Sequence, residues 1–383
     1  RHDYYSSYPY LINKIMQAHT YTSVVDPKLS ALFNAMFHSV PPKNFISSPL
    51  SVYLALAMVA EGASTESLKE LQAAMAFGNK PAIINDKVSQ AVFNLTKADP
   101  EAVVIKFSNS IYIANGFAVK DAYKKTLVNQ YKAEAANVDF ASPGTVKLVN
   151  DKISAATNGL IKDAVDQFTP TTQCVLVNTV YFKGKWATPF EKEETADADF
   201  TRIDGSKTKC KMMHKGGLYV GYLEGQNRKL ISISYKDAGY KFVIELPTDR
   251  QLNGSSSELV IEVANSQQSK VNVFIPKFKA TAKLELAPIL KNLGIKGIFA
   301  GGLEGISSSP LAVSSVIHQA CVSVDEFGTE AAAVTIMRML GCAMSREPPK
   351  EFRADSPFYF HIVDAERQIT LFSGAVTDPQ QSN

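Results

Sequence analysis

The chain has 383 residues, of which 45% are hydrophobic, and its formal net charge is +3. This balanced charge, without a dense cluster of Lys and Arg, argues against a nucleic-acid-binding protein, and no apolar run reaches the about 18 residues that a membrane span needs. No Gly/Ser-rich or Pro-rich tract separates two folded halves, so we expect a single domain over residues 1–383.

The first clear element is a helix near residue 50. Ser48 has the short hydroxyl side chain of a helix cap, and Pro49 suits the first helical position, where its missing N–H costs nothing. Residues 50–60 are apolar on nearly every face, which predicts a helix buried in the core. We expect it to end near Gly62.

Strand and helix patterns alternate along the rest of the chain. A helix is expected over 146–164, and strands over 104–113, 174–182, 271–274, 358–363 and 369–376, the last two forming a hairpin. In residues 207–212 the lysines alternate with Cys210 and Met212, which predicts a strand with Cys210 on its buried face. The fold class is therefore α+β, with large and mostly antiparallel sheets.

Lysine side chains gather between residues 120 and 132. We interpret these residues as a solvated helix face, with polyanion binding as the alternative: Lys120, Lys124, Lys125 and Lys132.

Two features suggest the cellular compartment. The sequence starts at Arg1 without a Met or an apolar leader, so we expect that a signal peptide has been removed. Asn94 and Asn253 open glycosylation sequons. Four cysteines in a chain of this length do not make a disulfide framework. We expect a secreted glycoprotein.

No motif for catalysis or for a cofactor is present. None of the six histidines lies in an H-E-x-x-H motif, and C-x-x-C, G-x-S-x-G, P-loop and dinucleotide-binding patterns are missing from the sequence. We therefore expect no enzyme, no metal site and no cofactor. His318 shares strand parity with Ala320, Val322 and Val324, so it should face the core and find a hydrogen-bond partner there.

Residues 326–349 combine two patterns. Residues 330–340 have fair helix propensity. With a period of two, the same stretch has one face without charge and another that carries Glu330 and Arg338, as expected of a strand with one buried face. No proline lies between Glu326 and Glu347 to interrupt a ladder of hydrogen bonds. The stretch can therefore enter a sheet, and the helical alternative stays open.

Several segments resemble the serpin family. The sequence E-F-G-T-E-A-A-A-V-T at 326–335 is similar to the hinge of inhibitory serpins, and F-K-G-x-W-x-x-P-F at 182–190 to a family signature. Four further blocks resemble the family in the right order, at 44–51, 276–278, 352–360 and 371–379. The resemblance covers roughly residues 29–379. It implies the serpin fold, with three mostly antiparallel sheets, about nine helices and an exposed reactive-centre loop at roughly 326–349.

The resemblance also implies a mechanism. A protease attacks the loop and forms an acyl-enzyme, and the loop then inserts into the main sheet and traps the protease, an insertion that is a known case of strand addition. The resemblance implies that three regions act in loop insertion. They are the hinge of the loop, the breach where insertion begins, and the shutter where the strands of the sheet separate. The hinge is Glu326, Gly328, Thr329, Glu330, Ala331, Ala332, Ala333, Val334 and Thr335; the breach is Trp186, Lys277 and Glu326; the shutter is Ser48, Pro49, Ser51, Asn178 and His318.

The family spacing from Glu326 implies attack at the bond between Cys342 and Ala343. The implied partner is an elastase-like or chymotrypsin-like serine protease, or a cysteine protease, and we expect a monomer. Phe327, Val334 and Lys152 depart from the family pattern, and the first two bear on how fast the loop inserts. The alternative is a non-inhibitory serpin that acts as a carrier, chaperone or storage protein.

Overall fold

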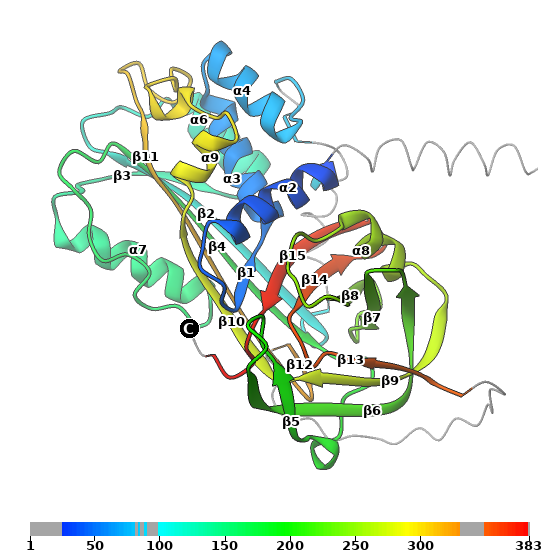
Figure 1. Ribbon diagram of the computed structural model, residues 1–383. Coiled ribbons are helices and arrows are strands. Elements are labelled where there is room, and N and C mark those ends of the chain that lie inside the picture. The colour runs from blue at the N-terminus through cyan, green and yellow to red at the C-terminus, as the bar shows by residue number, and fades with distance from the viewer. Residues whose placement is uncertain (1–24, 81–82, 85–87, 90–98, 330–347, 382–383) are drawn as a thin grey trace, which may run out of the picture.

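The computed structural model describes residues 25–80, 83–84, 88–89, 99–329 and 348–381. These residues form two sheets, and helices pack on both faces of the six-stranded one (Figure 1). The described residues contain seven α-helices: α2 (Val25–His38), α3 (Pro49–Gly62), α4 (Thr65–Met75), α6 (Asp121–Thr126), α7 (Pro143–Ala156), α8 (Ser257–Ala264) and α9 (Ala287–Asn292). Three short helical segments are also present: the π-helix η1 (Leu127–Tyr131) and the 3-10 turns η2 (Lys192–Glu194) and η3 (Gly297–Phe299).

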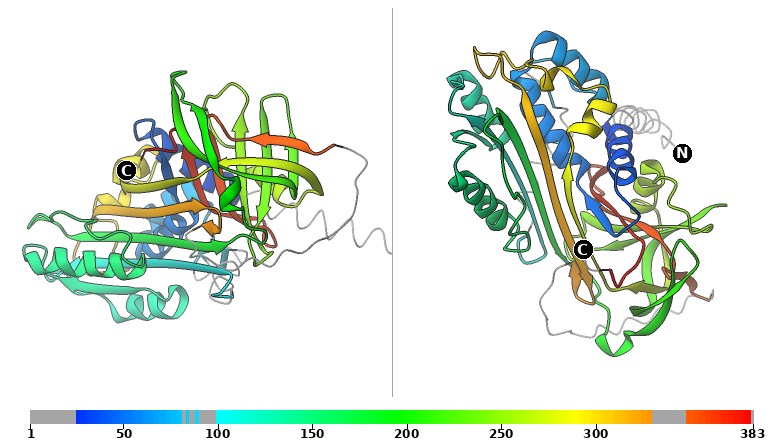
Figure 2. Two further views of the ribbon diagram at one scale, coloured as in Figure 1. Left: turned by 90° about the horizontal axis from the view of Figure 1, so that it is seen from below. Right: turned by 60° about the vertical axis from the view of Figure 1, so that its left-hand side comes forward.

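A six-stranded sheet runs in the order β10-β11-β12-β4-β2-β3. Its strands are β2 (Val103–Ala114), β3 (Glu134–Val138), β4 (Cys174–Lys185), β10 (Phe278–Glu285), β11 (Val313–Asp325) and β12 (Gly328–Thr329). Helix α3 packs on one face of this sheet and α7 on the other (Figure 2).

A nine-stranded sheet has the order β1-β15-β14-β8-β7-β6-β9-β13, with β5 paired to β6. Its strands are β1 (Phe45–Ser47), β5 (Ala196–Thr201), β6 (Lys207–Glu224), β7 (Arg228–Ser234), β8 (Tyr240–Pro247), β9 (Gln268–Pro276), β13 (Lys350–Arg353), β14 (Phe358–Asp364) and β15 (Ile369–Val376). The described residues thus form two sheets where the resemblance implied three. The reason lies in β6, whose 18 residues pass through a register break between Lys215 and Leu218 and so join two ladders into one sheet.

Helix α3 forms as the sequence predicts. The Ser48 hydroxyl accepts from the N–H of Ser51 (3.1 Å), Pro49 stands in the first turn, and every residue of the helix except Glu61 is buried. The strands expected at 104–113, 174–182, 271–274, 358–363 and 369–376 are present, and no end differs from the expected one by more than three residues. Cys210 is buried in β6, between exposed lysines.

The helix expected over 146–164 is shorter and starts earlier. Ser142 caps α7 and Pro143 begins it, while Asn158 and Gly159 end it because both take positive φ angles (51° and 77°). Residues 157–172 then cross the outer face of the six-stranded sheet without helical structure.

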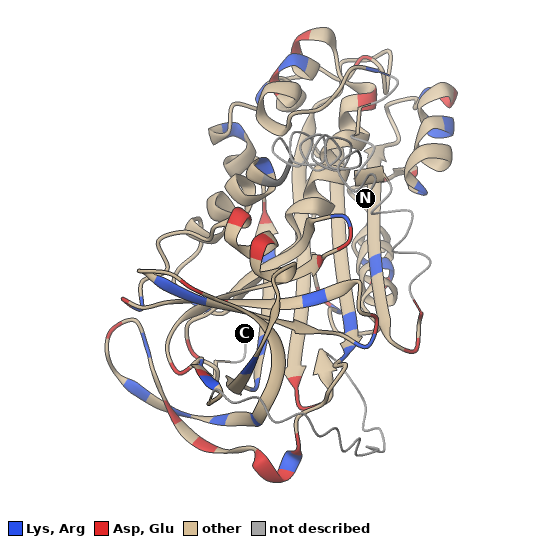
Figure 3. Ribbon diagram, turned by 90° about the vertical axis from the view of Figure 1, so that its right-hand side faces the viewer, with Lys and Arg blue, Asp and Glu red and all other residues tan. Residues whose placement is uncertain are grey.

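The outer strands carry interspersed charges rather than a field of one sign (Figure 3). Lys207 and Lys209 pair with Asp199, and Lys211 pairs with Asp197, across β5 and β6. These pairs are exposed and contribute little to stability. In the part of the chain that the structure describes, no helix is long and apolar enough to cross a membrane.

Candidate functional site

The centre of the six-stranded sheet is a parallel pair. Strands β4 and β11 run side by side from Cys174 with Val313 to Tyr181 with Cys321. We call this paired stretch the seam. Beyond it the two strands separate, and the two residues of β12 lie between them, antiparallel to both. The six-stranded sheet therefore already holds the first two residues of an additional strand.

Gly328 makes this arrangement possible. Its φ of +151° is a backbone conformation that side-chain-bearing residues rarely adopt, and a Cβ atom there would lie 2.0 Å from the carbonyl oxygen of Gly184. Asp325 supports the preceding turn by accepting from the N–H of Phe327 (2.8 Å). A glycine is thus required where the chain leaves β11 and turns back into the sheet.

The breach residues meet at this turn. Glu326 is 3% exposed, and its carboxylate accepts from Lys277 Nζ (2.8 Å) and from the Thr195 hydroxyl (2.9 Å). Burial alone would raise the pKa of Glu326, but the hydrogen bond and charge of Lys277 hold it below the ordinary value. This ion pair holds the turn at Glu326 against Lys277, the residue directly before β10.

Trp186 holds the same turn from the other side. Its indole N–H donates to the Asp325 carbonyl (2.9 Å) and its backbone N–H to the Phe327 carbonyl (3.0 Å). The indole stacks on Tyr235 at 4.9 Å between ring centroids, and the Tyr235 hydroxyl is 2.8 Å from Thr329 Oγ1. Aromatic packing and one buried hydrogen bond therefore fix the inserted Thr329.

The shutter residues form a buried network under the middle of the seam. His318 is fully buried, as its parity predicts. Its Nε2 accepts from the Ser48 backbone N–H (3.1 Å), so Nδ1 carries the proton and donates to Asn178 Oδ1 (2.5 Å). Burial lowers the pKa of His318 to about 3, so the imidazole is neutral.

Asn178 and Ser48 extend this network to other elements. Asn178 Nδ2 donates to the carbonyl of Ser51 (3.0 Å) and also contacts the Ser51 hydroxyl and Asn109 Oδ1. The Ser48 hydroxyl donates to the Leu371 carbonyl (2.6 Å) on β15. One set of buried hydrogen bonds thus joins β2, β4, β11, the start of α3 and β15.

A strap closes the outer face of the seam. We use this name for α7 with residues 157–172. Apolar side chains of α7 pack over β2 and β4 in a second hydrophobic cluster that includes Val149, Ile153 and Val177. Farther along the strap, the Ala164 carbonyl accepts from the Gln319 side chain on β11 (3.4 Å). The strap therefore touches the strands on both sides of the seam.

The structure places some expected site residues together and leaves others outside its described part. The shutter and breach residues lie as described above, with Pro49 buried at the start of α3. Asn253 is exposed in the segment between β8 and α8. The following lie outside the described residues: Glu330, Ala331, Ala332, Ala333, Val334, Thr335, Cys342, Ala343 and Asn94.

One expectation is wrong. The resemblance implied an exposed loop from about residue 326, but Glu326 is buried and Thr329 is already buried in β12. Three contributors were missed: Asn109, Thr195 and Tyr235. The one available signal was strand parity, which puts Asn109 on a buried-facing position of β2; the other two become neighbours only through the turn at Glu326.

Comparisons with known proteins agree over nearly the whole chain. A model of the serpin (serine protease inhibitor) family matches residues 30–379. An "Uncharacterized serpin-like protein" of Methanosarcina mazei is 33% identical over 361 residues, which is 89% of this chain and 83% of the relative. A "Serine protease inhibitor" of Cyanea capillata is 32% identical over 91% of this chain and 96% of its own length.

A solved structure shares the fold. Human thyroxine-binding globulin in complex with thyroxine matches with a TM-score of 0.82 and 23% identity, covering 94% of this chain and 98% of the globulin. At that identity the likeness shows the fold alone. The family model and the curated relatives carry the assignment further: the chain belongs to the serpin family of serine protease inhibitors and is not an enzyme.

Proposed function

We propose that the chain is a suicide-type protease inhibitor that traps its target by inserting the cleaved loop between β4 and β11. The observation that carries this proposal is β12, because two residues of the hinge already pair with both strands at the end of the seam. Below them, the strands that would receive the rest of the loop contact each other directly in parallel. Insertion would replace this parallel contact with two antiparallel ladders.

The register of β12 says where each loop residue would go. On β11, Thr329 pairs with Val324, and on β4 it pairs with Gly184. Continued along both strands, each pairing brings Thr335 opposite the shutter residues His318 and Asn178, which are themselves partners across the seam. Two independent registers thus agree on one position. Thr335 would enter on the face where His318 is buried, with a hydroxyl able to join the network.

The length of the seam supports Cys342–Ala343 as the attacked bond. In the same register, Met339 comes opposite Cys174, the first residue of β4. A strand that ends at Cys342 therefore fills the sheet with a few residues to spare. A strand that ends at Arg338 would stop one residue short of that point, whereas one that ends at Arg346 would pass it by seven residues rather than three.

The proposed chemistry is acyl transfer that stops at the acyl-enzyme, before hydrolysis. The protease nucleophile bonds to the Cys342 carbonyl carbon, the bond to Ala343 breaks, and the new amine of Ala343 takes the proton from the general base. Insertion then carries the acyl-enzyme along the seam before water attacks the ester or thioester. The expected target is an elastase-like or chymotrypsin-like serine protease, or a cysteine protease. We further propose secretion, with Asn94 and Asn253 as glycosylation sites.

The test compares two neighbouring charge substitutions. In the register above, Ala331 would face Val322 and Phe182, which are fully buried, whereas Glu330 would point to the opposite face. Ala331→Arg should therefore stop insertion because burying an unpaired charge costs several kcal/mol. The variant should still be cleaved, with the number of inhibitor molecules consumed per protease rising at least tenfold. Glu330→Arg is the matched control and should change this number by less than about twofold.

The first measurement is a protease panel. The protein is incubated with serine and cysteine proteases, SDS-stable adducts are sought, and the cleavage site is found by mass spectrometry. An adduct linked through residue 342 supports trapping. Clean cleavage without any adduct across the panel favours the carrier, chaperone or storage alternative, and equal damage by both arginine variants contradicts the proposed register.

A further inference from the structure

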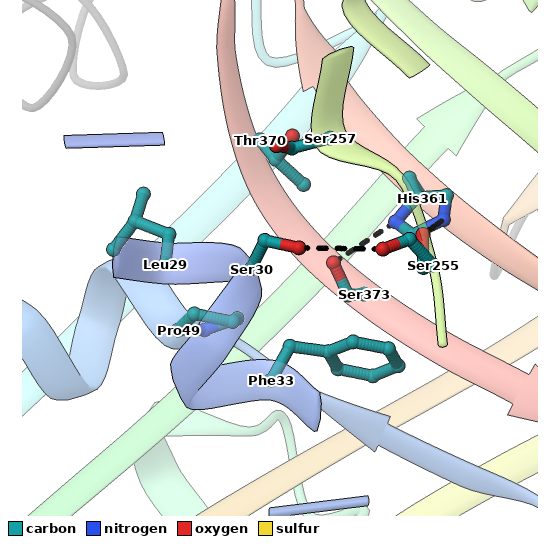
Figure 4. Close-up of a pocket in the computed structure, with 9 residues that line it drawn as sticks. All are labelled: Leu29, Ser30, Phe33, Pro49, Ser255, Ser257, His361, Thr370 and Ser373. Atoms are coloured by element: carbon teal, nitrogen blue, oxygen red, sulfur yellow. Dashed lines mark hydrogen bonds between the residues drawn. The ribbon is translucent and has the colours of Figure 1, made fainter. Parts of the chain in front are cut away.

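A small cavity beside Pro49 is lined by both apolar and polar side chains (Figure 4). Its walls come from α2, the start of α3, the segment before α8, and strands β14 and β15. Five hydroxyl-bearing residues line it: Ser30, Ser255, Ser257, Thr370 and Ser373. The space open to the centre of a water molecule is about 10 Å³, which suits one water and no larger ligand.

Thr370 is the residue that points to a ligand. It is 6% exposed, and its hydroxyl has no hydrogen-bond partner among the residues that the structure describes. Buried hydroxyls are nearly always paired, either within the protein or with ordered water. Thr370 lines the cavity, so its natural partner is a molecule inside it.

Ser373 supplies a second binding group. Ser255 donates its single hydroxyl hydrogen to Glu245 (2.7 Å), so in its 3.0 Å contact with His361 the imidazole Nε2–H must be the donor. Nδ1 of the same ring lies 2.9 Å from the Ser373 hydroxyl, which uses one hydrogen-bonding position of that oxygen. The Ser373 oxygen keeps a free lone pair and can accept from a molecule in the cavity.

We propose that this cavity binds one structural water. The water accepts the hydroxyl hydrogen of Thr370 and donates to Ser373, and the hydroxyls of Ser30 and Ser257 complete two to four hydrogen bonds, as buried waters require. The water thus connects α2, the segment before α8, and β15 through hydrogen bonds. The cavity holds a neutral molecule, since its small size excludes a hydrated ion.

The position of the water links it to the shutter. Pro49, which follows the shutter residue Ser48, also lines the cavity. The Ser48 hydroxyl donates to the carbonyl of Leu371, which follows Thr370. The water therefore lies one residue from the shutter network on two separate segments, and it stabilises the contact between the start of α3 and β15.

The test uses Thr370→Val in the full chain, a change that keeps the branched shape and removes the hydroxyl. Loss of the bridging water should lower the thermal midpoint by about 1–3 °C at a fixed scan rate. Ser47→Ala is the control, because Ser47 also has a buried hydroxyl with no partner in the described part of the chain but does not line the cavity. This control should leave the midpoint unchanged or slightly raised.

A midpoint for Thr370→Val that is unchanged or raised would mean a dry cavity with an unpaired hydroxyl, and it would overturn the proposal. Crystals of the unmodified protein provide the direct readout. Electron density within about 3.2 Å of both Thr370 Oγ1 and Ser373 Oγ is expected. A cavity without density there would equally refute the water.

Discussion

Among single residues, His318 is where the chemistry of the seam is most sensitive. It accepts one hydrogen bond from Ser48 and donates one to Asn178, so a second proton on the ring would leave the Ser48 N–H without an acceptor. The imidazole lies at the only position where β11, β4 and α3 share one polar network in the described residues. Protonation should therefore loosen all three elements together.

This arrangement gives a pH dependence with a defined sign. The unfolded chain binds a proton at His318 near pH 6.5, whereas the folded chain binds it only near pH 3. Between these values the unfolded state holds the extra proton, so stability falls as the pH falls. From pH 6.5 to pH 4.5 the loss should be about 2–3 kcal/mol. Urea unfolding of the unmodified protein and of His318→Gln measures it; parallel pH profiles for the two would contradict this role.

Cysteine reactivity is the second prediction at this scale. Cys174, Cys210 and Cys321 are buried, and burial raises the pKa of Cys174 to about 12 and that of Cys210 to about 11. These thiols should therefore react slowly, because the thiolate is the nucleophile. We expect alkylation of the native protein to mark Cys342 first and to impair inhibition. Faster labelling of any of the three others, read by mass spectrometry, would refute the loop placement.

Residue-scale features differed in how well the sequence foretold them. Strand parity correctly put His318 in the core and Cys210 on a buried face, because alternation depends only on neighbours along the chain. The burial of Thr329 was not foreseen. It depends on Gly328 turning the chain back between β4 and β11, which local patterns do not reveal.

Among elements, the strap is the segment that would have to shift if β4 and β11 separated along the seam. Helix α7 packs on the β2 and β4 side, while residues 164–172 reach β10 and β11, where Lys283 pairs with Asp166 (3.1 Å). Asn150 clasps the two parts together, accepting from the N–H of Val165 and donating to its carbonyl, each at 2.8 Å. A parting of β4 from β11 therefore pulls against this clasp.

Asn150→Ala should weaken the strap without touching the seam. Two partly buried hydrogen bonds are lost, which is worth about 1–3 kcal/mol, so opening of the seam should become about tenfold faster or more frequent. Hydrogen exchange of the amides of β4 and β11 measures this. Lys147→Ala on the outer side of α7 is the control, because its ion pair with Asp151 is exposed. Equal exchange in both variants would show that the strap does not restrain the seam.

The strap also shows why element boundaries were only partly predictable. Helical periodicity continued past Ala156 because Ile161, Ala164 and Val165 still face the sheet. The chain instead crosses the sheet at these residues, so their apolar pattern reflects the surface beneath them. Helix α3, by contrast, was foretold at both ends because cap, proline and apolar run all lie within its own sequence.

At the scale of the whole molecule, the six-stranded sheet can accept one more strand between β4 and β11. Along the seam these two strands are hydrogen-bonded to each other, so they must separate before the new strand can enter. Met337 and Met339 are the large apolar residues of the entering segment that share the face of Thr329 in this register. Burial of two such side chains is worth about 3–6 kcal/mol.

Cleavage between residues 337 and 345 should therefore raise the thermal midpoint sharply, since it frees the loop to enter. Calorimetry of nicked and intact protein compares the two states. The matched control is nicked Ala331→Arg, which is cleaved at the same place but cannot bury its arginine. If nicked and intact unmodified protein melt together, the protein is a serpin without the inserting mechanism.

The two residues of β12 also fix the direction of travel. A strand that is already paired at one end can add its remaining pairs one at a time from that end. The entropy cost of bringing the loop to the sheet is therefore met before any protease binds. At about 3.4 Å per residue, the thirteen steps from Thr329 to Cys342 carry the far end of the strand about 44 Å. A protease joined to that end would therefore be moved from one pole of this protein to the other. Its path would be set by the order in which the strand pairs form, starting from β12.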